Sequence, residues 1–352
     1  MKDKSFKAID FFCGAGGMTS GFRQAGVKLL AGIDIDQQCK ETYEFNHPNS
    51  KFIEADIKKL KYSELEKLVS IGKMDDQMIF IGCSPCQYFS TIKTNKTKSI
   101  ESKNLLSDFQ RFVKYYLPGY VVVENVPGIA KSHDSPLQEF INFLEKNRYK
   151  VSMDILRLEK FGIPQTRRRF LLVASRVDQN VSLPKESQLS NNTVRGFIHP
   201  KNGFPILKAG SKDASPNLHT VAGLSEINFK RLSLTEKNGG NRLSYVNNKR
   251  LAVPCQFKKP KIFHDTYGRM RWDRPAPTIT TKFFSISNGR FAHPSQDRAI
   301  SLREGATLQT FDLSYRFIGS SIGCIARQIG NAVPPLFAKQ IAETIVRSSF
   351  SN

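Results

Sequence analysis

Short apolar runs and amphipathic segments alternate along the first half of the chain, and this rhythm constrains the fold more than any other feature. The apolar runs that predict strands lie at residues 7–12, 29–34, 51–54, 77–82, 120–124, 149–158 and 169–175. Segments with helical spacing lie between them, from residue 19 onward and at residues 37–46, 105–116 and 137–146. Alternating strands and helices build a doubly wound, mostly parallel α/β sheet, in which ligands bind at the carboxyl ends of the strands.

This rhythm stops after residue 175. Residues 176–272 are rich in Asn, Ser, Lys and Gly and have no clear helical period, whereas a helical pattern returns at residues 326–346. We therefore predict two domains: a sheet domain of residues 1–178 plus 322–352, and a smaller, irregular domain with a hinge in residues 179–321.

Positive charge is concentrated in the irregular region. The whole chain has 53 Lys and Arg against 31 Asp and Glu, a net charge of +22. Residues 179–272 alone hold 16 Lys and Arg against 5 Asp and Glu. Because each neutralised phosphate releases counterions, such a surplus favours a polyanionic partner. The alternative, a generically basic protein, explains the net charge but not its concentration.

Hydropathy and cysteine content indicate the cellular compartment and the chemical state of the cysteines. No stretch reaches the roughly 18 apolar residues that cross a bilayer, and we expect no secretion signal at the charged start. We therefore expect a cytoplasmic protein, in which the six cysteines are thiols and not bridges. Cys83 and Cys86 form a C-x-x-C, which leaves a redox pair open, whereas zinc would need a second pair.

Residues suited to ligand binding follow the first three predicted strands. A glycine cluster of Gly14, Gly16 and Gly17 follows the first strand, where a ligand can press against backbone at a helix N-terminus. A plain tight turn is the alternative. Asp34 and Asp56 come at the ends of the second and third strands, where they suit ribose hydroxyls and an exocyclic amine, although each could be a helix cap.

The next strand ends bring a thiol and a carboxyl to one rim. Cys86 follows the fourth strand and Glu124 ends the fifth, so a parallel sheet places them at the same edge. A carboxylate would raise the pKa of a redox thiol, whereas a ring attacked at one atom and protonated at another needs both groups. Arg167 and Arg169 place two cations on one face of an extended segment, with a solvated basic turn as the alternative.

Together these residues resemble the DNA cytosine-5 methyltransferases, nearly end to end and in the family's order. The matching segments are Asp10-Phe-Phe-Cys-Gly-Ala-Gly-Gly17, Pro85-Cys86-Gln87, Asn104-Leu-Leu106, Glu124-Asn125-Val126, Gln165-Thr-Arg167-Arg-Arg169, Arg274-Pro-Ala-Pro-Thr278 and Gly330-Asn331-Ala-Val333. The resemblance implies a Rossmann-like, S-adenosylmethionine-dependent methyltransferase of the stand-alone prokaryotic restriction-modification type. Two departures are mild: Ser84 stands where many members have proline, and Ile35 replaces an aromatic residue that often packs on adenine, which predicts looser cofactor binding.

The resemblance also implies site residues. Those implied in catalysis are Cys86, Glu124, Arg167, Arg169, Gln87, Asn125 and Gln165. Those implied in cofactor binding are Phe12, Gly14, Ala15, Gly16, Gly17, Asp34, Ile35, Asp56, Ile57, Pro85, Leu106, Asn331 and Ala332. The residues that we expect to contact DNA are Ser90, Lys93, Lys96, Lys98, Arg242 and Arg269.

In the mechanism that the resemblance implies, the Cys86 thiolate adds to carbon 6 of a cytosine that has been flipped out of the duplex. Glu124 gives or shares a proton at N3, and carbon 5 then takes the methyl group. A base such as a held water removes the carbon 5 proton, and Cys86 leaves. Arg169 is expected to hold the cytosine O2, while Arg167 is expected to favour the thiolate or a nearby phosphate.

Partners and setting follow from the same resemblance. The basic loop at residues 91–103, with four lysines and one glutamate, is expected to close over the flipped nucleotide, with a solvated loop as the alternative. Specificity is expected in residues 179–272, through base edges in the major groove.

The implied product is S-adenosylhomocysteine, and no metal is expected. We expect a monomer that acts on double-stranded DNA in the bacterial cytoplasm or nucleoid, with no membrane, beside a cognate restriction endonuclease or other defence components.

Two other functions stay open at this point. One branch of the family methylates transfer RNA, although the sizeable basic region argues against that substrate. A catalytically silent DNA-binding relative is the second, although the intact Cys86, Glu124 and arginine pair argue against lost activity.

Overall fold

The chain forms two compact units. The computed structural model describes residues 5–85, 88–89, 103–187, 192–213, 215, 217–245, 247–252 and 265–348. Unit 1 comprises Met1–Leu158, Arg168–Glu186 and Val333–Asn352, and unit 2 comprises Glu159–Arg167 and Ser187–Ala332. Residues 159–167 and 322–332, predicted for the sheet domain, thus group with unit 2, whereas residues 179–186, predicted for the irregular domain, group with unit 1.

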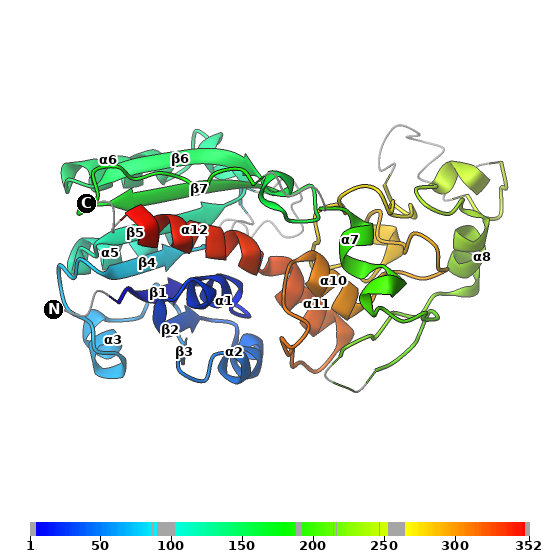
Figure 1. Ribbon diagram of the computed structural model, residues 1–352, viewed down its shortest axis with the longest axis horizontal. Helices are drawn as coiled ribbons and strands as arrows, with labels where there is room; N and C mark the ends of the chain where they lie inside the picture. The colour runs from blue at the N-terminus through cyan, green and yellow to red at the C-terminus, as the bar shows by residue number, and fades with distance from the viewer. Residues whose placement is uncertain are drawn as a thin grey trace. The chain divides into compact units, whose positions relative to one another are not determined.

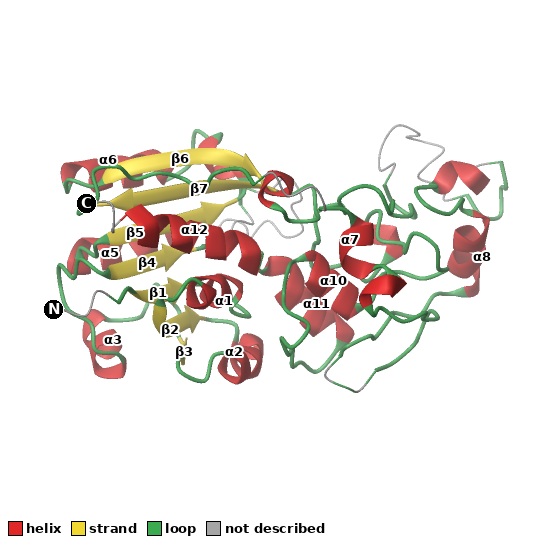
Figure 2. Ribbon diagram, viewed as in Figure 1, coloured by secondary structure: helices red, strands yellow, loops and turns green. Residues whose placement is uncertain are grey.

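Unit 1 is built on a seven-stranded sheet with the order β3-β2-β1-β4-β5-β7-β6 (Figures 1 and 2). The strands are β1 (Lys7–Phe11), β2 (Lys28–Asp34), β3 (Lys51–Glu54), β4 (Met78–Gly82), β5 (Tyr120–Asn125), β6 (Lys150–Arg157) and β7 (Arg168–Ser175). The first five are parallel, and β7 runs antiparallel to both β5 and β6. The predicted mostly parallel α/β sheet is confirmed. Because β7 is reversed, which the strand rhythm does not reveal, it begins at the edge where β1–β5 end.

Helices cover both faces of this sheet. They are α1 (Gly17–Gln24), α2 (Lys40–Asn46), α3 (Tyr62–Leu68), α5 (Leu105–Tyr116), α6 (Leu137–Lys146) and α12 (Pro335–Ser348). The helices α5 and α6 have the predicted bounds, whereas α3 is not indicated by the sequence pattern. Figure 1 shows α12 in front of the strands, beside α1.

Alternation along the strands separates two apolar layers. Phe11, Phe80 and Phe109 of α5 are fully buried on one face, and the Phe11 ring centroid lies 5.2 Å from each of the other two. On the opposite face α1 packs against α12 so closely that a Cβ on Gly21 would lie 2.4 Å from the Cβ of Ala338. Packing on both faces therefore holds β1 and α1, and with them the two ends of the glycine cluster.

The described part of unit 2 has little regular secondary structure, as its sequence indicates. The α-helices described there are α7 (Val194–Ile198), α8 (Glu226–Leu234), α10 (Leu302–Leu308) and α11 (Ile322–Asn331). The one helical pattern at residues 326–346 corresponds to two helices, since α11 ends at Asn331 and α12 begins at Pro335. Prolines at 334 and 335 account for the break, because proline lacks the N–H that a continuing helix needs.

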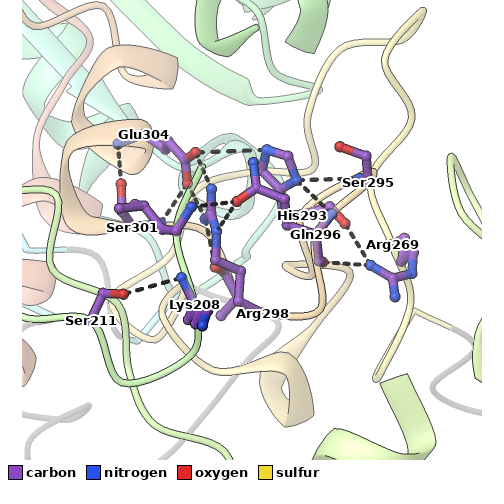
Figure 3. A network of polar contacts seen from close by, with 11 residues as sticks. Lys208, Ser211, Arg269, His293, Ser295, Gln296, Arg298, Ser301 and Glu304 are labelled. Carbon is purple, nitrogen blue, oxygen red and sulfur yellow. Dashed lines mark hydrogen bonds and ion pairs between the residues drawn. The ribbon is translucent and has the colours of Figure 1, made fainter. Parts of the chain in front are cut away.

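Buried charges stabilise part of unit 2 (Figure 3). Arg298 donates to both carboxylate oxygens of Glu304, at 2.6 and 2.7 Å, and Glu304 and Ser301 form a capping box at the start of α10. Burial alone would raise the pKa of Glu304, but the hydrogen bonds and charge of Arg298 hold it below its ordinary value. Burial lowers the pKa of His293 to about 3, so its neutral Nδ1 accepts from the backbone N–H of Gln296. The buried charges of Arg298 and Glu304 thus compensate each other.

Candidate active site

The glycine cluster forms a tight loop between β1 and α1. Phe12, Gly14 and Gly16 have φ values of 65°, 50° and 83°, a left-handed conformation that costs a residue such as Phe12 about 1–2 kcal/mol. A Cβ on Gly14 would meet no atom within 4 Å, so the loop borders open space. The helix α1 begins at Gly17 without a side-chain cap. A ligand can therefore approach the backbone of the first turn.

Asp34 ends β2 and holds this loop in place. Its Oδ2 accepts from the backbone N–H of Gly14 at 2.7 Å, and its Oδ1 accepts from that of Asp36 at 2.8 Å. Burial raises the pKa of Asp34, and these backbone donors offset part of that effect. The next residue, Ile35, is 67% exposed. An exposed apolar side chain beside a carboxylate suits a ligand that combines a sugar with a flat base.

Asp56 occupies the corresponding place after β3. Its Oδ1 accepts from the backbone N–H of Lys58 at 3.0 Å and so starts the following turn, while its Oδ2 contacts none of the described residues. Ile57 and Leu106 are almost fully buried in the main core of unit 1, and Phe12 packs against the same core. Phe12, Ile57 and Leu106 thus belong to one apolar cluster. Ile57 and Leu106 are part of the core itself, so their burial has a structural reason besides any ligand.

Glu124 and Arg169 lie side by side at the same edge of the sheet. The register pairs Glu124 with Leu171, so the antiparallel β7 carries Arg169 just past the end of β5. Arg169 Nε lies 2.8 Å from Glu124 Oε1, in the orientation of an ion pair and not of a directed hydrogen bond. The two side chains are only 14% and 8% exposed, which strengthens their attraction. A carboxyl and a guanidinium held this way can act together on one polar ring.

Asn125 ties this pair to the loop after β4. Its Nδ2 donates to the backbone oxygen and to the Oγ of Ser84, at 3.2 Å each. Pro85 follows as an exposed residue. Cys86 and Gln87 lie outside the described residues, so the nearest described anchor of the expected nucleophile is Ser84, two residues before it. Asn125 therefore holds Ser84 in place, a contact that the sequence does not reveal.

Gln165 and Arg167 lie in unit 2 and are enclosed there. Gln165 Nε2 donates to Leu308 O at 3.0 Å and to Gln309 Oε1 at 2.7 Å. Arg167 donates to three backbone carbonyls, those of Ile279, Gly330 and Ala332. The exposed fractions of Gln165 and Arg167 are 0% and 2%. Arg167 is predicted to favour the Cys86 thiolate or a nearby phosphate. Its guanidinium is buried among carbonyls of unit 2, which argues against the phosphate contact, and the thiolate contact stays a prediction because Cys86 lies outside the described residues.

Two expected DNA contacts need the same correction. Arg269 is fully buried, donates to four backbone carbonyls of unit 2 and pairs with Asp297. Arg242 is only 4% exposed. Neither guanidinium can reach a DNA backbone from these positions, because each is covered by its own unit. The other expected contacts, Ser90, Lys93, Lys96 and Lys98, lie outside the described residues, as does most of the 91–103 loop.

Sequence reasoning missed Gln309, which connects several of these segments. It accepts from Gln165, and its Nε2 donates to Ile329 O at 2.7 Å and Ala332 O at 3.1 Å. The hydrogen bond to Ala332 thus connects the segment of Asn331 and Ala332 to this polar cluster of unit 2. The side chain of Asn331 is exposed. A readable signal was the Ser301-x-x-Glu304 capping box, which marks the helix that carries Gln309 at its end.

Similarity to known proteins identifies the family of this chain. The model of the C-5 cytosine-specific DNA methylases matches residues 6–347. The chain belongs to this family. It is therefore a DNA methyltransferase that acts on carbon 5 of cytosine. Within the family it is 36% identical over 345 residues to the type II methylase M.HgiDII of Herpetosiphon aurantiacus, covering 96% of this chain and 94% of that one. It is 31% identical to the type II methyltransferase M1.HphI of Haemophilus parahaemolyticus, covering 97% and 87%.

Solved structures agree with the methylase fold. A structure from E. coli named for a prophage-encoded DNA modification methyltransferase matches with a TM-score of 0.74 at 22% identity, over 98% of this chain and all of that one. The Entamoeba histolytica methyltransferase EhMeth matches with a TM-score of 0.67 at 16% identity, over 98% and 99%. At these identities the likeness concerns the fold alone.

None of the described helices is long and apolar enough to cross a membrane. In the same part of the chain, His, Cys, Asp and Glu side chains form no group of three or more that could hold a metal ion.

Proposed function

We propose that this methylase transfers a methyl group from S-adenosylmethionine to carbon 5 of a cytosine within a specific double-stranded DNA sequence, with Cys86 as the nucleophile. The observation that carries the proposal is the buried Glu124–Arg169 pair. It lies at the sheet edge that also bears the glycine loop, and Asn125 connects it to Ser84, two residues before Cys86.

The described residues at this edge fit the cofactor. S-adenosylmethionine supplies a methyl group activated by a sulfonium. Asp34 would hold the ribose hydroxyls, and the exposed Ile35 with Phe12 would flank the adenine. The Asp56 Oδ2, which contacts none of the described residues, would accept from the adenine amine. Isoleucine offers a smaller contact than an aromatic ring, so cofactor binding should be looser than in members that carry the aromatic residue.

The reaction needs a nucleophile, a proton and a cation around one ring. Addition of the Cys86 thiolate to carbon 6 forms a sulfur–carbon bond and moves electron density to carbon 5. Glu124 gives or shares a proton at N3, and Arg169 beside it offsets negative charge at O2. After methylation a base removes the carbon 5 proton, the electrons restore the double bond, and the Cys86 sulfur leaves. Because stacking hides carbon 6, the cytosine must be flipped out of the duplex.

DNA contacts are proposed from the exposed cations of unit 2, in place of Arg242 and Arg269. Lys249, Arg250 and Arg271 are exposed and would bind phosphates, which carry affinity but no sequence information. The proposed setting is the bacterial cytoplasm, with a monomeric enzyme and a cognate restriction endonuclease nearby.

Bisulfite sequencing of a genome exposed to the protein tests the proposal, because it reports activity, target base and sequence context together. We expect methylation of cytosine at one short motif, none with Cys86→Ser, and none on transfer RNA incubated in parallel. Methylation by Cys86→Ser at the wild-type rate would overturn the mechanism, and transfer RNA as the preferred substrate would overturn the assignment to DNA.

A further inference from the structure

Unit 1 contains a cavity of about 520 Å³. None of the residues that line it is assigned above to catalysis, cofactor binding or DNA binding. It lies between α1, the start of β2 and the turn from α2 to β3. The polar residues that line it include Thr19, Arg23, Lys28, His47 and Ser50. Its volume is within the range of sites for small molecules, about 300–1,000 Å³.

The lining combines free cations with buried hydrogen-bonding groups. Arg23 and Lys28 are exposed and form no ion pair with the described residues. Thr19, His47 and Ser50 are almost fully buried, with exposed fractions of 0%, 1% and 8%. Burial lowers the pKa of His47 to about 3, so its imidazole is neutral and adds no charge. Two cations above neutral polar groups favour an anionic ligand.

Apolar side chains complete the cavity. Val27 and Leu29 line it and are 2% and 5% exposed. An inorganic ion alone would fill little of the 520 Å³, whereas an organic anion with a ring or a short chain would occupy more of it.

The same side chains contact the glycine loop. Thr19 Oγ1 donates to Asp10 Oδ2 at 2.7 Å, and Asp10 lies two residues before Phe12. Tyr43 connects Thr19 to Ser50, at 3.3 and 2.8 Å. The imidazole of His47 is hydrogen-bonded to the backbone of Gly16. A ligand that contacts Ser50, the most exposed of the three buried polar side chains, thus acts through Tyr43 and Thr19 on Asp10, which precedes the loop.

We propose that this cavity binds a small organic phosphate or carboxylate, and that its occupancy changes the affinity of the glycine loop for the cofactor. Arg23 and Lys28 bind the anionic group, and Val27 and Leu29 contact the apolar part. Since coupling between two sites is reciprocal, the cofactor changes the affinity for the anion by the same factor. The coupling rests on the proposed cofactor site, whereas anion binding does not.

Calorimetric titration of the full chain with phenyl phosphate tests the binding. We expect saturable binding that falls by about tenfold or more in the Arg23→Ala/Lys28→Ala double variant, which corresponds to at least about 1.4 kcal/mol. Lys67→Ala/Lys114→Ala is the matched control, because it removes two exposed lysines of unit 1 away from the cavity, and it should bind as the wild type does. Benzyl alcohol, which keeps the ring without the charge, should not bind measurably.

The outcomes separate the two parts of the proposal. Binding lost only in the cavity variant supports the site, and equal binding by both double variants overturns it. Titration with S-adenosylmethionine, with and without saturating phenyl phosphate, should give dissociation constants that differ several-fold. Equal constants overturn the coupling, and absent cofactor binding in both titrations, with phenyl phosphate still bound, counts against the proposed function and not against the cavity.

Discussion

The two arginines of the Gln-x-Arg-x-Arg segment allow a direct test of their separate roles. The structure places Arg167 among buried carbonyls of unit 2 and Arg169 beside Glu124. Arg167→Ala removes the donors to three buried carbonyls, at distances of 3.2–3.5 Å. These bonds are longer than the optimum, so we count about 1 kcal/mol for each and expect a loss of about 3 kcal/mol in the free energy of unfolding. Arg167→Lys keeps the charge but not the planar fork and should lose about half as much.

Unfolding in urea measures this loss directly in unit 2. The chain has one tryptophan, Trp272, which is buried in that unit with 7% of its surface exposed. Its fluorescence should report the change as a lower midpoint, or as a Tm lower by about 6–12 °C for a unit of this size. Arg169→Lys, which keeps a cation beside Glu124, should unfold as the wild type does but methylate about 100-fold more slowly. If Arg167→Ala unfolds at the wild-type urea concentration, the reasoning from the carbonyls is refuted.

Three further outcomes follow from the same geometry. Glu124→Gln should slow single-turnover methylation by about 100-fold while cofactor binding is unchanged, and a rate near wild type would exclude Glu124 as the proton donor. Asn125→Ala frees Ser84 and should lower kcat by about tenfold without changing the KM for the cofactor, whereas a change confined to KM would contradict the positioning role. His293, with its pKa lowered to about 3 from 6.5, stays neutral when folded but binds a proton when unfolded, so stability should fall by about 1.4 kcal/mol per pH unit as the pH drops below 6.5. His293→Gln should flatten this dependence in Trp272 fluorescence, and an unchanged slope would point to other groups.

The sequence predicts the catalytic edge well because its residues sit at strand ends. Once the strands are taken as parallel, Asp34 and Glu124 must share an edge, and their neighbours in the chain come with them. The reversal of β7 is not readable from the pattern, yet it places Arg169 at the same edge. Local order along the chain is sufficient here, because each group is fixed by the end of its own strand.

The sequence does not predict which arginines are buried. Arg242 and Arg269 are predicted to contact DNA and Arg167 to favour the thiolate or a nearby phosphate, and each of these roles needs an accessible guanidinium. Their burial depends on carbonyls that come from distant parts of the chain, such as Ala332 for Arg167 and His293 for Arg269. A sequence gives the charge of a side chain but not the acceptors that surround it. The same limit applies to Gln309, whose partners lie as far away as Gln165.

The short stretch Glu159–Arg167 belongs to unit 2 although Arg168–Glu186 of unit 1 separates it from the rest of that unit in the chain. Any chimera that borrows a recognition unit from a relative must therefore transplant two pieces, this stretch together with Ser187–Ala332. A graft of the long piece alone would leave the native Gln165 and Arg167 facing foreign carbonyls. The fit of these two side chains to the new carbonyls would then decide which relatives can supply a working unit 2, so nine residues outside the long piece control the exchange.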